Sequence, residues 1–292
     1  MIAAIAPAKI NLYLHVGGVR RDRLHELKSL FLFADAGDVV SVEPARDLTL
    51  AIAGPFSTPL LKEPLERNLV MRAARLLQRE TGVGAGARIT LDKRLPIASG
   101  VGGGSADAAA TLRALMKLWG LDLPAPRLAA LAFALGADVP ACLSLAPVLV
   151  AGAGERLQRA PKLPPLWVCL VNPGVAMPTG PVFRAFDAEN PAPAPPQDPD
   201  FSGARGIGGL RALLAATRND LEPYAAARAP VIAQAIARLS AQPGALPARM
   251  SGSGATVFAL FNARSAAARA ATIMRAQGWW ALDAQLFGAG GR

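Results

Sequence analysis

Residues 95–109 read Leu-Pro-Ile-Ala-Ser-Gly-Val-Gly-Gly-Gly-Ser-Ala-Asp-Ala-Ala and place four glycines within the five positions 100–104. The preceding residues 87–94 alternate apolar and polar side chains, as a half-buried strand does. The apolar residues that follow recur at helical spacing through residue 119. A glycine-rich bend that leads into a helix leaves backbone N–H groups unpaired and uncrowded, which favours an anion, most often phosphate. A flexible surface loop is the alternative, but the order strand, loop, helix favours a phosphate site.

The glycine run matches neither of the two common nucleotide-binding loops. The P-loop pattern G-x-x-x-x-G-K-[ST] needs a Gly-Lys pair, and the sequence contains none. The dinucleotide pattern G-x-G-x-x-G/A occurs at residues 82–87, but it follows a predicted helix at 68–80 and precedes a strand, the reverse of the required order. The glycine run must therefore hold phosphate mostly through backbone N–H groups, with the hydroxyl of Ser105 at the start of the helix.

Two charged residues stand alone in apolar surroundings and are candidates for chemistry. Asp138 lies in Gly-Ala-Asp-Val-Pro at 136–140, and Lys9 lies in Pro-Ala-Lys-Ile-Asn at 7–11. Burying a lone charge costs several kcal/mol, roughly, unless a counter-charge or hydrogen-bond donors compensate. Asp138 is either a helix cap or turn, or a carboxylate held in a site as a base, and the residues alone leave both open. Lys9 and Asp138 could each compensate the other.

A second glycine cluster, Met-Ser-Gly-Ser-Gly-Ala-Thr at 250–256, precedes a predicted strand. Glycines at this spacing allow either a tight turn or a close approach of the backbone to a ligand. Taken by itself, the cluster favours the turn.

Composition and charge narrow the class of protein. The chain has 292 residues, enough for two medium domains, and 52% of them are hydrophobic, which predicts a globular protein. The formal net charge is +10, which suits nucleic acid or an anionic small substrate. The basic residues are scattered and aromatic residues make up only 5%, so we expect no nucleic-acid partner.

The cysteines and the apolar stretches predict a cytoplasmic protein without a membrane anchor. The two cysteines, Cys142 and Cys169, both lie in apolar runs and cannot form a disulfide framework, which suggests a reducing compartment. The start of the chain lacks the charged region and cleavage site of a secretory signal. Residues 128–154 are almost wholly apolar, but Gly136, Pro140 and Pro147 interrupt them, which favours a helix and a buried strand over a membrane span.

The periodicity of the chain predicts an α+β protein with two domains, residues 1–160 and 161–292. Strands are expected at 2–6, 10–16, 30–34, 39–43, 48–53, 87–94, 146–151, 155–159, 166–171, 255–261 and 280–286. Helices are expected at 68–80, after the glycine run, and at 126–135, 207–216, 224–240 and 264–277. Pro7 should separate the first two strands, residues 35–38 should form a turn, and the Pro-rich residues 190–199 should be a loop or linker.

Four segments together resemble the conserved motifs of the GHMP small-molecule kinases. They are residues 7–11, 96–109, 136–140 and 250–256, and the match extends from about residue 6 to residue 260 in the family's order. Within that family, His-Glu-Leu at 25–27, Asn-Leu-Val at 68–70 and Gly-Val-Ala-Met-Pro-Thr at 174–179 resemble the members that phosphorylate a cytidine diphosphate alcohol in non-mevalonate isoprenoid synthesis. The resemblance implies a ribosomal-S5-like N-terminal domain, a ferredoxin-like C-terminal domain and an active site in the cleft between them.

The resemblance also implies two substrates and a metal, namely ATP, a small cytidine diphosphate substrate and Mg²⁺. In the family's pattern the glycine run covers the ATP phosphates, and Ser105 lies near the metal. Two further positions, Asn68 and Lys93, match those that line the nucleoside of ATP. The implied ATP-binding residues are Asn68, Lys93, Pro96, Ile97, Ala98, Ser99, Gly100, Val101, Gly102, Gly103, Gly104, Ser105 and Ala106.

The catalytic and acceptor-binding roles follow from the same resemblance. Asp138 would accept the proton of the substrate hydroxyl, and Lys9 would keep Asp138 ionised and stabilise charge on the reacting oxygens. His25 would bind the edge of the cytosine and Phe183 would stack on its ring. The other implied substrate-binding residues are Asn11, Thr179, Ser251 and Gly252. A membrane partner is not expected, and both a monomer and a homodimer are left open.

One position departs from the family's pattern. Where the family usually reads Asp-Gly-Tyr-His-Glu-Leu, residues 22–27 read Asp-Arg-Leu-His-Glu-Leu, so Leu24 replaces an aromatic ring. Two other functions stay open at this point. One is a GHMP kinase for homoserine, mevalonate or a sugar, although these lack the pairing of His25 with Phe183. The other is a non-catalytic nucleotide- or RNA-binding protein, for which only the basic charge argues.

Overall fold

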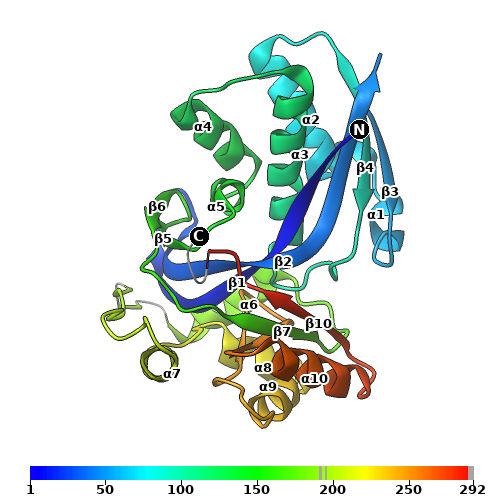
Figure 1. Ribbon diagram of the computed structural model, residues 1–292. Helices are drawn as coiled ribbons and strands as arrows, with labels where there is room; N and C mark the ends of the chain where they lie inside the picture. The colour runs from blue at the N-terminus through cyan, green and yellow to red at the C-terminus, as the bar shows by residue number, and fades with distance from the viewer. Residues whose placement is uncertain (191–192, 195, 289–292) are drawn as a thin grey trace. The chain divides into compact units, whose positions relative to one another are not determined.

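The computed structural model describes residues 1–190, 193–194 and 196–288. The chain forms two compact units that alternate along the sequence. Unit 1 contains Met1–Ala8, Ala36–Ile97 and Gly102–Leu145, and unit 2 contains Lys9–Asp35, Ala98–Val101 and Ala146–Arg292. Strands β1 (Ile2–Val19) and β2 (His25–Ala45), drawn in blue in Figure 1, supply residues to both units.

Unit 1 combines strands with a group of helices. The second half of β2 pairs antiparallel with β4 (Gly86–Asp92), and β4 pairs parallel with β3 (Thr49–Ala53). Helices α2 (Leu69–Thr81) and α3 (Gly103–Trp119) pack side by side, as Figure 1 shows. The remaining elements of unit 1 are α1 (Thr58–Leu61), the 3₁₀ turn η1 (Leu65–Arg67), α4 (Ala125–Leu135) and α5 (Val139–Ser144).

Helix α2 shows how local sequence sets an element that carries a candidate site residue. Its N-cap is Asn68, whose Oδ1 accepts a hydrogen bond from the backbone N–H of Val70 at 2.9 Å. Its C-cap is Gly82 in the left-handed conformation. Val70, Ala73, Ala74 and Leu77 form the buried face between these caps, at helical spacing. The predicted helix at 68–80 is thereby confirmed.

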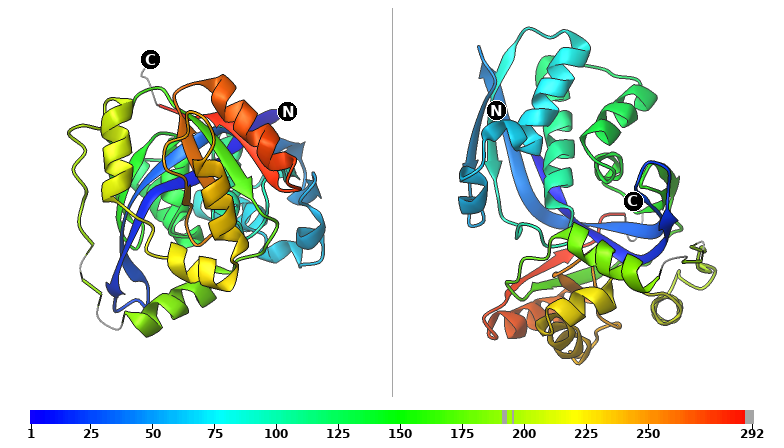
Figure 2. Two further views of the ribbon diagram at one scale, coloured as in Figure 1. Left: turned by 90° about the horizontal axis from the view of Figure 1, so that it is seen from below. Right: turned by 180° about the vertical axis from the view of Figure 1, so that it is seen from behind.

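Unit 2 is built on an antiparallel sheet with the strand order β10-β7-β9-β8. Helices α9 (Val231–Ser240) and α10 (Arg264–Arg275) pack against it, and Figure 2 shows them gathered on one face. Apolar residues of the sheet and helices, among them Val171, Val257, Phe261 and Leu239, make its core. The strands are β7 (Trp167–Asn172), β8 (Arg249–Met250), β9 (Val257–Phe261) and β10 (Trp280–Gln285); β5 (Val148–Gly152) pairs with the first half of β2 and with β6 (Arg156–Arg159). The other helices are α6 (Thr179–Glu189), α7 (Ile207–Ala216) and α8 (Glu222–Arg228).

Two predicted breaks in the first strands are wrong. Pro7 lies inside β1, and the partner strand makes room there with Gly37, since a Cβ on Gly37 would lie 2.0 Å from the carbonyl oxygen of Ala6. Residues 35–38 continue β2 instead of turning. Their carboxylates have tertiary partners, because Asp35 Oδ1 accepts from the N–H of Gln285 at 2.8 Å and Asp38 is buried. Acidic residues that resemble a turn signal can therefore lie in a continuous strand.

Several other helices and strands differ from those that the sequence periodicity predicts. The predicted helix 224–240 is two helices, α8 and α9, which meet at Pro230, where proline cannot donate a helical hydrogen bond. The short helix α5, the helix α6 and the two-residue strand β8 were not predicted. Residues 190, 193–194 and 196–199 lie outside helices and strands, as expected for a loop, while residues 191, 192 and 195 of that prediction fall outside the described residues. No helix in the described ranges is long and apolar enough to cross a membrane.

Candidate active site

The first turn of α3 has the features expected of a phosphate-binding helix start. Its N-cap is Gly102 with φ of 63°, a left-handed conformation that a side chain would strain, and no side chain caps the helix. Helix geometry leaves the first N–H groups without intrahelical partners. Ser105 follows in the same turn, and Leu69 of α2 packs against this turn, 3.3 Å from where a Cβ on Gly104 would lie. Backbone N–H donors and the hydroxyl of Ser105 are therefore present together in the first turn of α3, where Ala106 is buried.

A buried cluster of three ionisable side chains, Asp38, Lys93 and Asp107, lies next to the first residue of α3. The ammonium nitrogen Nζ of Lys93 donates to Asp38 Oδ2 at 2.5 Å and to Asp107 Oδ2 at 2.7 Å. Lys93 is 3% exposed, Asp38 0% and Asp107 3%. Burial raises the pKa of Asp107 to about 7, although the charge of Lys93 opposes the shift. Burial would lower the pKa of Lys93, but the two carboxylates outweigh it and raise that pKa.

Residues 98–101, which include the first glycine of the run, belong to unit 2, where backbone hydrogen bonds hold them. The carbonyl oxygen of Ala98 accepts from the N–H of Met177, that of Ser99 accepts from Thr256, and that of Val101 accepts from Lys9. Gly100 has no room for a side chain, because a Cβ there would lie 2.2 Å from the carbonyl oxygen of Ser251. The second glycine cluster, 250–256, therefore supports the first one by close backbone packing.

Lys9 is the centre of a polar group on β1 and β2. Its Nζ donates to Asn11 Oδ1 at 3.0 Å and lies 4.1 Å from the centre of the Phe31 ring. Asn11 donates from Nδ2 to Ser29 Oγ at 3.0 Å, and its backbone N–H donates to Ser251 Oγ at 3.1 Å. Lys9 and Asn11 are both buried. This part of unit 2 thus brings together Lys9, Asn11 and Ser251 from the predicted site.

Asp138 lies in the short link between α4 and α5 of unit 1. It occupies the N-cap position of α5, but its side chain makes no capping hydrogen bond with that helix. A capping role is therefore absent at α5. Asp138 is half-buried.

His25 and Phe183, both predicted to bind the cytosine, meet in unit 2. Their ring centres are 4.6 Å apart at a tilt of 37°. Nε2 of His25 also lies 2.7 Å from Oδ1 of Asp187, one turn farther along α6. Leu24 next to His25 is 43% exposed, so that neighbouring position offers an aliphatic surface to solvent. An aromatic surface and a carboxylate-bound imidazole therefore lie together on β2 and α6.

The other residues that the sequence predicts to bind the substrate lie near the second glycine cluster. Thr179 Oγ1 is 2.9 Å from Ser253 Oγ, and a Cβ on Gly252 would lie 3.5 Å from Asn11 Oδ1. Asn219 holds this loop by donating from Nδ2 to the carbonyl oxygens of Met250 and Gly252, at 2.9 and 2.8 Å. In unit 2 the structure therefore brings the residues of β1, α6 and the 250–256 loop into one polar region.

The residues at the start of α3 fit a magnesium ion held mainly by phosphate. Within the described ranges, no group of three or more His, Cys, Asp or Glu side chains is arranged to hold a metal. Mg²⁺ prefers oxygen ligands and is often held by one or two protein oxygens together with substrate phosphates. Ser105, at the start of a helix that suits phosphate, is an oxygen donor of the right kind.

Sequence reasoning missed the residues that support the site through tertiary contacts. Asp38 belongs to residues 35–38, which the sequence predicts as a turn, and Asp107 has no signal beyond its place in the predicted helix after the glycine run. Asp187 lies in α6, which the sequence does not predict. Phe31 under Lys9 had no signal beyond its place in an apolar strand. Each of the three carboxylates contacts a partner at least 14 positions away along the chain, so no local pattern could have revealed it.

Comparison with known proteins agrees with this geometry. Residues 68–144 match the family model for the GHMP kinases N-terminal domain, and residues 204–278 match the model for the GHMP kinases C-terminal domain. The chain is 52% identical over 291 residues to a 4-diphosphocytidyl-2-C-methyl-D-erythritol kinase of Cereibacter sphaeroides, covering 99% of this chain and all of the relative. A protein of the same name from Paramagnetospirillum magneticum is 48% identical, covering 96% of this chain and 97% of the relative.

Solved structures show the same likeness. A crystal structure of 4-(cytidine 5'-diphospho)-2C-methyl-D-erythritol kinase aligns with a TM-score of 0.79 at 35% identity, covering 99% of this chain and 100% of that one. A homoserine kinase from Cytophaga hutchinsonii aligns with a TM-score of 0.72 at 20% identity, covering 97% and 93%, which shows a shared fold only. The two-domain fold, the likeness over nearly the whole chain and both family models lead to one conclusion: the chain belongs to the GHMP kinases.

Proposed function

We propose that this kinase transfers the γ-phosphoryl group of ATP to the 2-hydroxyl of 4-(cytidine-5′-diphospho)-2-C-methyl-D-erythritol. The observation that carries the choice of acceptor is the 52% identity, over 291 residues, to a relative that bears the name of this kinase. The pairing of His25 with Phe183 in unit 2 supports it, because an aromatic face next to a hydrogen-bonding ring suits a nucleobase.

In the proposed reaction the start of α3 holds the phosphates of ATP. The N–H groups of its first turn point at the phosphate oxygens, and the positive end of the helix dipole favours their charge. Mg²⁺ would be held by phosphate oxygens and the hydroxyl of Ser105, where it supplies charge neutralisation. Phosphoryl transfer needs positioning and electrostatic stabilisation more than covalent help from the protein.

Asp138 and Lys9 take the catalytic roles in this proposal. Asp138 accepts the proton of the acceptor hydroxyl as that oxygen forms its bond to the γ-phosphorus. The bond between the γ-phosphorus and the bridging oxygen breaks, and ADP leaves with the electron pair. Lys9, which Phe31 and Asn11 hold in one orientation, supplies positive charge that stabilises the reacting oxygens and keeps Asp138 ionised.

The cytidine half of the acceptor is assigned to unit 2. Phe183 stacks on the cytosine and His25 binds its edge, while Asn11, Thr179, Ser251 and Gly252 line the region of the diphosphate and alcohol. Asn11 is hydrogen-bonded to Ser251, and Thr179 lies within hydrogen-bond distance of Ser253, as a prearranged polar region requires.

A coupled assay of ADP release tests the proposal against its alternatives. The enzyme is offered the cytidine diphosphate alcohol, mevalonate, homoserine and galactose in turn, with MgATP. We expect rapid ADP release only with the cytidine compound. Faster release with any other acceptor, or RNA binding without ADP release, would overturn the assignment.

A further inference from the structure

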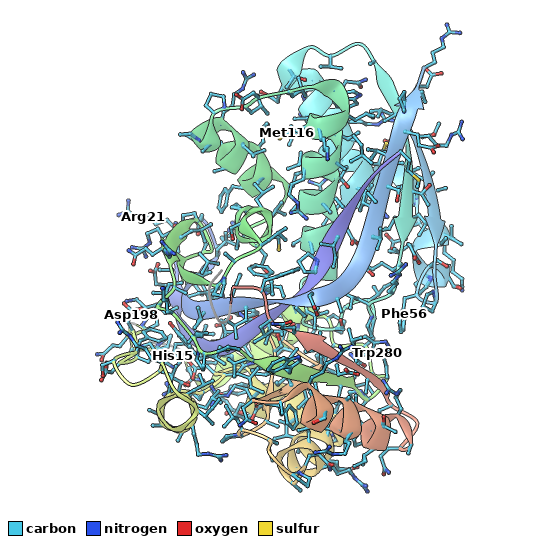
Figure 3. The ribbon with its side chains drawn as sticks, viewed as in Figure 1. His15, Arg21, Phe56, Met116, Asp198 and Trp280 are labelled. Carbon is cyan, nitrogen blue, oxygen red and sulfur yellow. The ribbon has the colours of Figure 1, made fainter. Side chains whose placement is uncertain are left out.

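The segment that precedes the glycine run is anchored by one buried carboxylate. Asp38 Oδ1 accepts hydrogen bonds from the backbone N–H groups of Arg94, at 2.6 Å, and Leu95, at 2.8 Å. Lys93 is held through its own backbone as well, because its N–H donates to the carbonyl oxygen of Ala53 and its carbonyl oxygen accepts from Phe56, labelled in Figure 3. The entry to the glycine run is therefore fixed to β2 and β3.

The exit from the glycine run is anchored by the same cluster. Asp107 lies at the start of α3 and binds the Lys93 ammonium at 2.7 Å. A Cβ on Gly103 would lie 3.0 Å from Lys93 Nζ and 3.6 Å from Asp38 Oδ2, so the first residue of α3 rests on the cluster. The ammonium group of Lys93 thus connects the segment before the glycine run with Gly103 and Asp107 at the start of α3.

The environment of Lys93 argues against direct contact between its ammonium and a nucleotide. The side chain is almost fully buried, and two carboxylates already accept from Nζ. Breaking either buried pair would leave a buried charge uncompensated, which is strongly unfavourable. Lys93 therefore acts on a nucleotide through the backbone that it supports.

A glycine-rich loop needs such support because it has little stiffness of its own. Glycine loses more conformational entropy on ordering than any other residue. A flexible glycine loop would therefore bind phosphate more weakly, because the entropy lost on ordering the loop offsets part of the binding free energy. Donors already held in position avoid this loss. Fixing both ends of the run to one buried cluster adds to the order that the hydrogen bonds of residues 98–101 already supply.

We propose that Asp38 and Asp107 are positioning residues for ATP, which hold the two ends of the glycine run in place through the ammonium group of Lys93. The inference rests on ATP binding in the proposed function and is independent of the acceptor's identity. Asp38 carries most of the effect, since it also binds the backbone of Arg94 and Leu95.

The test measures nucleotide binding directly. Calorimetry with a non-hydrolysable ATP analogue and Mg²⁺ gives Kd for wild type, Asp38→Asn and Asp107→Asn, and kinetics give KM for each substrate. Asp38→Asn is expected to weaken analogue binding and raise the KM for ATP by about tenfold or more, as small misplacements of a binding group do. The KM for the cytidine substrate is expected to stay within about twofold of wild type. Glu43→Gln is the matched control, because Glu43 lies on β2 as well but forms an exposed ion pair with Arg88 at 3.6 Å.

Asp107→Asn keeps the proposal testable if Asp38→Asn does not fold. It leaves the pair between Lys93 and Asp38 and both backbone hydrogen bonds intact, so we expect a folded protein with a Kd weakened about threefold to tenfold. A purely structural role would lower the melting temperature of either variant and leave Kd unchanged in the folded fraction, and that result overturns the inference. Wild type that does not bind the analogue would instead contradict the proposed function itself, and the inference with it.

Discussion

The imidazole Nε2 of His25 lies 2.7 Å from Oδ1 of Asp187, across 162 positions of sequence. An ionised carboxylate only accepts hydrogen bonds, so Nε2 is the donor in this contact, and Nδ1 is an acceptor whenever the ring is in its neutral form. An acceptor at that position can take a hydrogen bond from the amino group of cytosine, which uracil lacks. Asp187 therefore orients the ring that the proposed function assigns to base recognition.

Replacing Asp187 should weaken recognition of cytosine. In Asp187→Asn the amide can donate to Nε2, which reverses the tautomer and turns Nδ1 into a donor. We expect the KM for the cytidine substrate to rise about tenfold and the preference over the uridine analogue to fall, because a site that hydrogen-bonds one substrate group discriminates less once that contact is lost. The KM for ATP should not change. Glu189→Gln, on the exposed face of the same helix, serves as control, and equal preference in both variants would contradict the role of Asp187.

The proposed base predicts a large loss of turnover without loss of folding. Asp138→Asn should lower kcat by about 10²-fold or more, the scale for a positioned base, and leave ATP binding intact. Lys9→Ala should fall in the same range, and the double variant should lose less than the product of the two because the residues act together. Asp122→Asn, at an exposed aspartate of unit 1, controls for the loss of charge. Near-normal turnover in folded Asp138→Asn protein would refute the assignment.

The first residue of α3 offers a steric test of the phosphate site. Gly103→Val places a branched side chain on the Lys93 ammonium, where even a Cβ would approach to 3.0 Å. The KM for ATP should rise by about tenfold or more, or ATP binding should be lost, while the cytidine substrate still binds. At Gly84 no heavy atom lies within 4 Å of an added Cβ, so Gly84→Val is the control. Unchanged ATP affinity by calorimetry would argue against this helix start as the phosphate site.

Leu24 predicts a gain of function. A tyrosine at this exposed position next to His25 could stack on the second face of the cytosine, and stacking adds roughly 0.5–1.5 kcal/mol beyond area burial. Leu24→Tyr should therefore lower the KM for the cytidine substrate by up to about tenfold. Leu61→Tyr, at an exposed leucine of α1, is the control. A neutral or harmful effect would show that another side chain supplies the second face.

Local patterns predicted the elements whose residues carry their own signals. The helix α2 has an Asn cap, an apolar face and a closing glycine in sequence, and α7 matches its predicted limits of 207–216. Pro230 is a local signal of the same kind, and it ends the helical pattern even though the apolar spacing continues on either side of it. The breaks predicted at Pro7 and at residues 35–38 are wrong because contacts with Gly37 and Gln285 accommodate these residues in continuous strands. Those contacts are known only from the tertiary fold.

Sequence reasoning proposes a candidate site where residue type is tied to backbone geometry. A glycine run between a strand and a helix predicts a phosphate site, whereas Asp38 and Asp107 contact a lysine 55 and 14 positions away. Asp187 could not be predicted either, because its partner His25 lies 162 positions away in the sequence. The domain limits of 1–160 and 161–292 and the catalytic roles of Lys9 and Asp138 stay predictions.

Phosphorus NMR of the reaction products tests the central claim most directly. The enzyme is incubated with MgATP and an equal amount of 4-(cytidine-5′-diphospho)-2-C-methyl-D-erythritol, and the phosphorus signals are followed to completion. We predict one new phosphomonoester, on the 2-hydroxyl, formed in step with ADP and with the diphosphate bridge intact. ADP and inorganic phosphate without that monoester would contradict the account, as would a monoester formed on mevalonate or homoserine at a comparable rate.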